Sequence, residues 1–104
     1  MYLFSIENLG DQKYQPISLV KGSTIQSKNM FKDMGQGFKS MVGGELKSYT
    51  KMMNEARDIA ISRMVEEAEK LGADAIVGVR FSSAAVTQGA AEIMAVGTAV
   101  KFLG

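Results

Sequence analysis

Three residue types are missing from this sequence of 104 residues, which contains no histidine, no cysteine and no tryptophan, and it has a single proline. Without imidazole or thiolate, the Ser-His-Asp and Cys-His arrangements of nucleophilic catalysis are impossible, and so is a zinc site of the usual nitrogen and sulfur ligands. Any metal ion would need carboxylates, carbonyls or thioethers. A general acid or base would have to be a carboxylate, lysine or tyrosine, and no such pair stands out. We therefore expect no enzyme, no cofactor and no dedicated metal site.

The sequence also lacks an excess of charge of one sign, because 12 Lys and Arg nearly balance 11 Asp and Glu, with a formal net charge of +1. So small a charge creates no long-range field that would gather nucleic acid or an acidic membrane. The first residues lack the basic region and the apolar run of about 7 to 15 residues typical of a signal peptide. No stretch approaches the roughly 18 apolar residues of a membrane helix. We expect a cytoplasmic protein that binds neither nucleic acid nor membranes.

The length and the β-prone segments predict one domain, residues 1–104, with four strands. These strands are expected over residues 2–6, 14–26, 73–81 and 92–102. Pro16 lies near the start of the second strand, and Gly22 is expected at a bulge or at a close approach of another backbone. The small residues of 82–91 are expected to connect the last two strands.

A helix with two distinct faces is predicted from residue 29 to about residue 42, where Gly43 and Gly44 follow. Its basic face carries Lys28, Lys32 and Lys39. Its apolar face carries Met30, Met34, Phe38 and Met41. Thioethers on that face could hold a soft cation or contact a partner, but core or subunit-interface packing is the simpler reading. The basic face is either solvated or presented to an acidic surface.

A second helix is predicted over residues 45–71, with Gly72 as the left-handed residue that ends it. It would be about 40 Å long, whereas a compact domain of this size is about 33 Å across. Its apolar residues cover roughly 240° of the helical wheel, far more than one contact surface needs. Arg63 and Glu67 project near the middle of this arc, where buried charges would require partners, such as an ion pair across a subunit boundary. The helix is therefore expected to bury two faces, one on a sheet and one on another chain.

The predicted order of strand, strand, helix, helix, strand, strand indicates an α+β fold, in which an antiparallel sheet carries helices on one face. Several motifs in this order closely resemble those of the YbjQ-like family, and the resemblance covers nearly the whole chain. They are Asn29, Asp33, V-G-G-E-L-K-S-Y (42–49), A-R-D-I-A (56–60), L-G-A-D-A-I-V-G-V (71–79) and G-T-A-V (97–100).

What the resemblance implies is a dodecin-like subunit that assembles into a ring, a homopentamer whose strands and helices are shared between neighbours. The family has no established activity and is labelled as heavy-metal-binding. Some of its members have a cysteine on the strand before residues 20–22, whereas this chain has none. Binding of a soft metal through thiolate is therefore excluded here.

Two functions of different kinds are compatible with these observations. The first is a non-catalytic homo-oligomer that binds a small ligand or a hard metal ion at its subunit boundaries. Its candidate ligand-binding residues are Asp33, Glu45, Tyr49 and Arg57, each of which could equally serve packing. Its candidate interface residues are Met30, Met34, Phe38, Met41, Tyr49 and Met53. The alternative is an interaction module whose ring presents Lys28, Lys32 and Lys39 to a partner.

Overall fold

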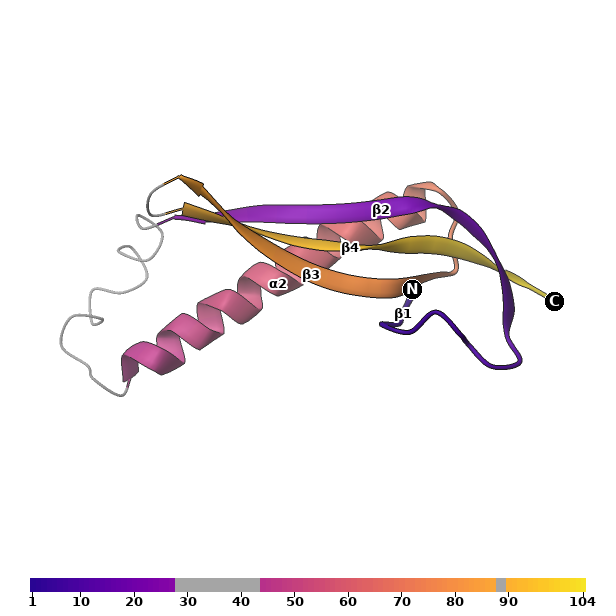
Figure 1. The fold of residues 1–104 in the computed structure, drawn as a ribbon, viewed down its shortest axis with the longest axis horizontal. Coiled ribbons are helices and arrows are strands. Elements are labelled where there is room, and N and C mark those ends of the chain that lie inside the picture. Colours follow the sequence, from indigo (N-terminus) through magenta and orange to yellow (C-terminus); the bar gives the residue numbers. More distant parts are fainter. Residues whose placement is uncertain (28–43, 88–89) are drawn as a thin grey trace.

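The fold is described by a computed structural model over residues 1–27, 44–87 and 90–104. Its elements are β1 (Tyr2–Leu3), β2 (Lys13–Ser27), α2 (Gly44–Lys70), β3 (Ala75–Thr87) and β4 (Ala90–Leu103). The strands form one sheet in the order β1-β3-β4-β2, and α2 packs on one of its faces (Figure 1). The α+β class is confirmed. The helix predicted over 29–42 lies outside the described residues.

The sheet is mixed, so the prediction of a wholly antiparallel sheet was wrong. β3 and β2 are both antiparallel to β4, but β1 runs parallel to β3 and pairs Tyr2 with Ala75 and Leu3 with Ile76. The reason is the path of residues 4–12, which lead from β1 at one edge to β2 at the opposite edge, so β1 and β2 cannot form a hairpin,. β1 is also shorter than the predicted strand over 2–6. Phe4 nevertheless exchanges backbone hydrogen bonds with β3, and the Ile6 carbonyl accepts one from the Gly78 amide.

The last two strands are longer than predicted. Residues 82–87 continue β3 instead of forming a connection, and they pair with β4 from Ser82 opposite Met94 to Thr87 opposite Ala90. Small side chains gave this segment the composition of a loop, but regular backbone pairing with β4 keeps it extended. The structure accordingly extends to 56 Å along its longest axis.

The helix packs on the sheet through one stripe of buried residues. This stripe consists of Met52, Ala56, Ala60, Met64 and Ala68, spaced four residues apart. Alanine at three of the five positions brings the helix close to the sheet, and β2 meets it with a glycine. A Cβ on Gly22 would lie only 2.3 Å from both the Ala60 carbonyl oxygen and the Met64 amide nitrogen. The close approach predicted at Gly22 is confirmed, whereas the bulge in β2 falls between Pro16 and Ser18.

The C-terminus of α2 ends as its sequence predicted. Gly72 has a φ of 75°. Its amide donates to the Glu69 carbonyl at 3.0 Å, while the Ala73 amide donates to the Ala68 carbonyl at 3.2 Å. These two bonds form a Schellman motif, which satisfies carbonyls that the helix would otherwise leave unpaired.

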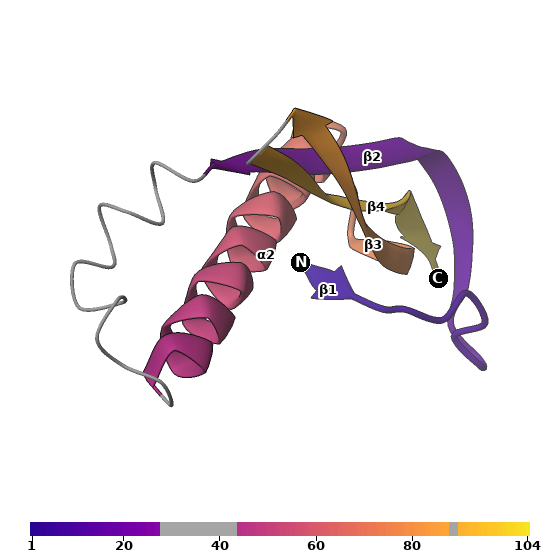
Figure 2. The ribbon, with the colours of Figure 1, turned by 60° about the vertical axis from the view of Figure 1, so that its left-hand side comes forward.

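The other half of α2 leaves the sheet, and its N-terminal end points away from the strands (Figures 1 and 2). In the single chain Arg63 and Glu67 are both exposed. Arg63 donates to the carbonyl of Ser23 on β2. An ion pair of these residues across a subunit boundary involves a second chain and stays a prediction. The Cα radius of gyration is 16.9 Å, compared with about 13 Å for a compact chain of this length.

A second, smaller core lies on the opposite face of the sheet. Ala75 and Val77 alternate with Ile76 along β3, so they point away from the helix and pack with Val100,. The N-terminal segment and the ends of β2 and β4 cover them with Phe4, Leu9, Tyr14 and Phe102. The segment before β2 is therefore an integral layer of the fold.

Candidate functional site

The structure describes the side chains of only some of the predicted site residues. Asp33, Met30, Met34, Phe38 and Met41 lie outside the described residues, as do Lys28, Lys32 and Lys39 of the basic face. Glu45 and Tyr49 belong to the first two turns of α2, where only the backbone is described. Arg57 and Met53 are fully described, and the structure places both beside the same hollow.

This hollow, which we call the Arg57 hollow, opens where α2 diverges from the β3–β4 hairpin. It has a volume of about 130 Å³. Its described lining residues are Met53, Arg57, Phe81, Ser82, Ser83 and Ile93. Ser83 pairs with Ile93 across the two strands, and Phe81 on the same face remains 47% exposed. Sequence analysis missed the residues of β3, because 82–91 had the composition of a connection.

The electrostatics of the Arg57 hollow favour an anion. The Arg57 side chain is exposed, and its Nη1 donates to Asn54 Oδ1 at 3.0 Å. Among the described residues, no carboxylate oxygen lies within ion-pair distance of this guanidinium. A cation held in place by a neutral amide keeps donors available for a carboxylate or a phosphate, and it disfavours a metal ion at the same place.

A buried polar group lies on the same face of the sheet. Thr24 pairs with Ile93, and Gln26 is the next residue of β2 on that face, only 4% exposed. Gln26 Oε1 accepts no hydrogen bond from the described residues. Since an unpaired buried acceptor costs about 1–3 kcal/mol, this end of the sheet suits contact with a further donor.

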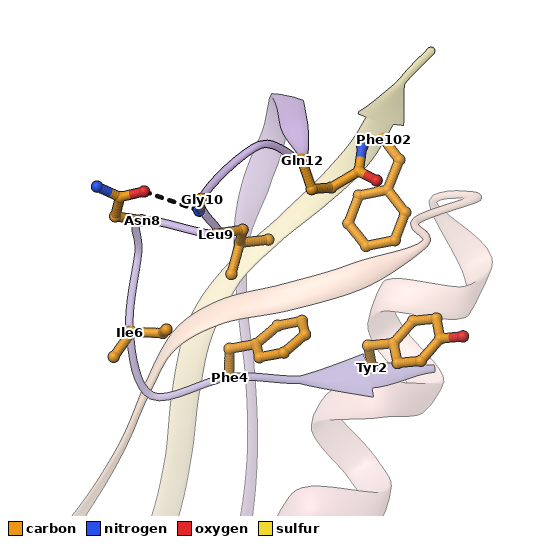
Figure 3. A pocket seen from close by; sticks show the side chains of 8 residues that line it. All are labelled: Tyr2, Phe4, Ile6, Asn8, Leu9, Gly10, Gln12 and Phe102. Carbon is orange, nitrogen blue, oxygen red and sulfur yellow. Dashed lines mark hydrogen bonds between the residues drawn. The ribbon is translucent and has the colours of Figure 1, made fainter.

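A second concavity, the aromatic groove, lies away from the Arg57 hollow, beside the N-terminal segment (Figure 3). It has a volume of about 700 Å³ and is formed by the N-terminal segment and the end of β4. Its described lining residues are Tyr2, Phe4, Ile6, Asn8, Leu9, Gly10, Gln12 and Phe102. No sequence pattern predicts this groove, because Phe102 is separated from the other seven lining residues by most of the chain.

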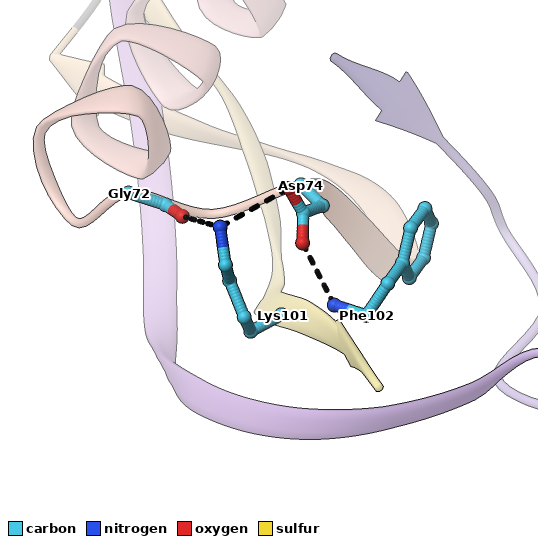
Figure 4. A network of polar contacts seen from close by, with 4 residues as sticks. All are labelled: Gly72, Asp74, Lys101 and Phe102. Atoms are coloured by element: carbon cyan, nitrogen blue, oxygen red, sulfur yellow. Dashed lines mark hydrogen bonds and ion pairs between the residues drawn. The ribbon is translucent and has the colours of Figure 1, made fainter. Parts of the chain in front are cut away.

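A network around Asp74 holds the Phe102 side of the aromatic groove (Figure 4). The Phe102 amide donates to Asp74 Oδ2 at 2.8 Å, and Lys101 Nζ lies 3.3 Å from Asp74 Oδ1. Lys101 also donates to the Gly72 carbonyl at 3.2 Å. The Phe102 hydrogen bond, followed by the interactions with Lys101, lowers the pKa of Asp74 below its ordinary value of 3.8, although partial burial opposes this shift,. Asp74 therefore ties the start of β3 to the end of β4.

The architecture defines a class of small α+β proteins that is known from a crystal structure. That structure is of a protein of unknown function from Pediococcus pentosaceus ATCC 25745, assigned to the DUF74 family. It matches with a TM-score of 0.70 over 99% of this chain and 98% of that chain, at 14% sequence identity. At this identity the match shows the fold alone.

The sequence comparisons identify the family. A model of the YbjQ_1 family, described as "Putative heavy-metal-binding", matches residues 1–103. A UPF0145 protein of Clostridium novyi (strain NT) is 56% identical over 103 residues, which cover 99% of this chain and 100% of the relative. A UPF0145 protein of Alkaliphilus metalliredigens (strain QYMF) is 54% identical with the same coverage. The chain belongs to the YbjQ_1 family, as its motifs indicated.

The residues of this chain do not fit the heavy-metal label. Heavy metal ions prefer thiolate and imidazole ligands, and the sequence contains neither cysteine nor histidine. Within the described ranges, no three acidic residues gather closely enough to hold a metal ion. Of the eight methionines, Met52 and Met64 are buried in the main core, where their thioethers serve packing.

The described part of the chain contains no helix with the length and hydropathy of a membrane-spanning segment.

Proposed function

We propose that the protein is a non-catalytic homo-oligomeric ring of five subunits, which binds a small anion in the Arg57 hollow at the boundary between neighbours. The observation that carries this proposal is that both edges of the sheet have long open stretches. β2 is an edge strand of 15 residues. The N-terminal segment bonds to β3 only as far as Val79, which leaves the outer edge of residues 80–87 open. In the described part of the chain no further strand pairs with either edge.

Long open edges favour pairing with another chain, because their unpaired N–H and C=O groups form a ready template. The two edges here are different, so pairing of β2 with β3 of a neighbour is a head-to-tail contact, which closes into a ring when the rotation permits. Sheet twist supplies such a rotation. The number five comes from the family resemblance, with which the elongated shape of the subunit agrees.

The same arrangement supports a ligand site at the boundary. The Arg57 hollow lies beside the free part of β3, so a neighbour that pairs with this edge would border it. Its volume of about 130 Å³ corresponds to about four water molecules, which is enough for a carboxylate or a phosphate group. The absence of imidazole and thiolate supports binding without catalysis, because the most frequent general base and the most reactive side-chain nucleophile are missing.

Two measurements test this proposal. Light scattering after size-exclusion chromatography should give five chains of 11.2 kDa, about 56 kDa, and native mass spectrometry should show whether an adduct is retained. A monomer across the accessible concentrations would refute the ring.

Titration with inorganic phosphate tests the anion site. Arg57→Ala should weaken phosphate binding at least about tenfold, because charge-assisted hydrogen bonds contribute about 1.5–3 kcal/mol. Lys51→Ala is the matched control, since it removes an exposed cation from the same helix away from the hollow. If both variants bind phosphate like the wild type, the anion site is refuted. If Arg57→Ala dissociates the ring, Arg57 serves assembly and not the ligand.

A further inference from the structure

The aromatic groove differs from the Arg57 hollow in place and in chemistry. All eight of its described lining residues are uncharged, and five of them are aromatic or aliphatic. Its volume of about 700 Å³ is in the range of small-molecule sites, about 300–1,000 Å³. Large apolar side chains remain open to solvent on it, because Tyr2 is 65% and Ile6 58% exposed. We propose that the aromatic groove binds a neutral, planar aromatic molecule.

The rings of the groove provide flat contact surface. Tyr2 and Phe4 are alternate residues of one extended segment, so their side chains point to the same side; their ring planes are 16° apart and the centroids 6.4 Å apart,. Phe102 approaches from β4 with its centroid 6.1 Å from that of Tyr2 and its plane tilted by 36°. Figure 3 shows these three rings together with Leu9, which lies beside Gly10 on the loop of the N-terminal segment. Such surfaces favour a planar aromatic partner, which gains from stacking and edge contacts as well as from burial.

The lining of the groove argues for a neutral occupant, because none of its described residues carries a charged side chain. Beside Phe102, the carboxylate of Asp74 and the ammonium of Lys101 already interact with each other at 3.3 Å. A charged ligand would lose hydration in the groove without gaining an opposite charge from its described lining,.

A carboxamide at the rim suits a neutral polar edge on the ligand. Gln12 Nε2 donates to the Lys13 carbonyl at 2.9 Å. Among the described residues this leaves Gln12 Oε1, beside Phe102 in Figure 3, as an acceptor. Asn8 instead stabilises the loop, because its Oδ1 accepts from the Gly10 amide at 2.9 Å. The groove therefore combines an apolar floor with one amide acceptor at its rim, as specific small-molecule sites combine apolar surface with few polar groups.

A pair of fluorescent probes with the same rings tests the proposal. N-phenyl-1-naphthylamine is neutral, and 1-anilinonaphthalene-8-sulfonate adds one negative charge. The neutral probe should bind one per chain and at least tenfold more tightly than the sulfonate. No saturable binding of the neutral probe, or equal affinities for both, would overturn the proposal.

Variants locate the binding and separate it from assembly. Tyr2→Ala and Ile6→Ser remove exposed side chains from the groove. Each should lower the affinity for the neutral probe at least tenfold, while the molecular mass of the assembly stays that of the wild type. Phe81→Ala is the matched control, because it removes an exposed aromatic ring from the Arg57 hollow, and it should leave the probe's affinity unchanged. Affinities that are unaltered in both groove variants, or reduced equally by Phe81→Ala, would overturn the site. A change of mass in Tyr2→Ala and Ile6→Ser would instead assign the groove to a contact with a second copy, again against the proposal.

The outcome is independent of the Arg57 hollow. Phosphate binding tests Arg57, and the neutral probe tests the aromatic groove beside the N-terminal segment. Failure of either experiment therefore leaves the other conclusion standing.

Discussion

Replacing Gly22 by alanine should destabilise the fold strongly, because the position has no room for a side chain. The added Cβ would lie 2.3 Å from Ala60 O and from Met64 N, whereas ordinary contacts begin at 3.4 Å. Both clashing atoms belong to the helix backbone, so no rotamer change relieves them. β2 and α2 would have to separate by about 1 Å, a gap at which packed atoms lose a quarter to a half of their dispersion energy.

We expect Gly22→Ala to lower the free energy of unfolding by about 3 kcal/mol, at the upper end of the range for overpacked cores. This is a large part of the roughly 5–15 kcal/mol that stabilises a typical domain. It corresponds to a fall in Tm of about 12–24 °C. Urea unfolding followed by circular dichroism, at one protein concentration for all variants, measures the change.

Two other glycines serve as controls. At Gly97 the Cβ would meet the Ile76 Cγ2 methyl at 2.5 Å and the Val77 carbonyl oxygen at 3.2 Å. Alanine should destabilise here too, but less than at Gly22, because the only backbone contact is longer. At Gly72 nothing lies within 4 Å, and alanine should cost only the about 1–2 kcal/mol of its left-handed conformation,. The close packing of β2 on α2 is refuted if the free energy of unfolding of Gly22→Ala lies within about 0.5 kcal/mol of the wild-type value. It is also refuted if Gly22→Ala loses less stability than Gly72→Ala.

Three further predictions concern the described core and its polar groups. Asp74→Asn weakens the acceptor of the Phe102 amide. Because the pKa of Asp74 is lowered in the folded state, the wild type should be more stable than the variant at pH 7,. This difference in stability should shrink as the pH falls below about 4 and the carboxylate becomes protonated,. Urea midpoints between pH 7 and pH 3 measure it, and a difference independent of pH would contradict the role of the carboxylate. Gln26→Met removes an Oε1 that accepts no hydrogen bond from the described residues, and it should stabilise the chain by about 1 kcal/mol in urea unfolding,. Destabilisation would show that a donor does bind this oxygen. Met64→Ala leaves a cavity at a fully buried position and should lower the free energy of unfolding by about 2–5 kcal/mol,. Ile59→Ala is the control and should cause a much smaller loss of stability, because Ile59 is 39% exposed. Equal losses would place Met64 outside the core.

The parts of the fold that could be predicted are those with local causes. The predicted helix over 45–71 agrees with α2 to within one residue at each end, because helical periodicity and a left-handed glycine act over a few residues. The close approach at Gly22 could likewise be predicted, because a glycine within a strand often lies where another part of the backbone comes close. The motifs and their order along the chain were sufficient to identify the family.

The candidate sites could be predicted only in part. Arg57 and Met53 were selected from their motif and from the helix, but the rest of the Arg57 hollow comes from β3 and β4. The aromatic groove joins Phe102 to residues near the N-terminus. No periodicity connects such distant residues, because their contact depends on how the strands are ordered.

What the sequence by itself determined is therefore the α+β class, the long helix with its terminal glycine, and the exclusion of histidine and cysteine chemistry. Tertiary structure decided that β1 joins β3 in parallel, that residues 82–87 extend the sheet, and that two separate hollows form. The physical reason is the range of the interactions. Capping and periodicity act within a few residues, whereas strand pairing and burial join residues that are far apart in the chain and are decided by the fold as a whole.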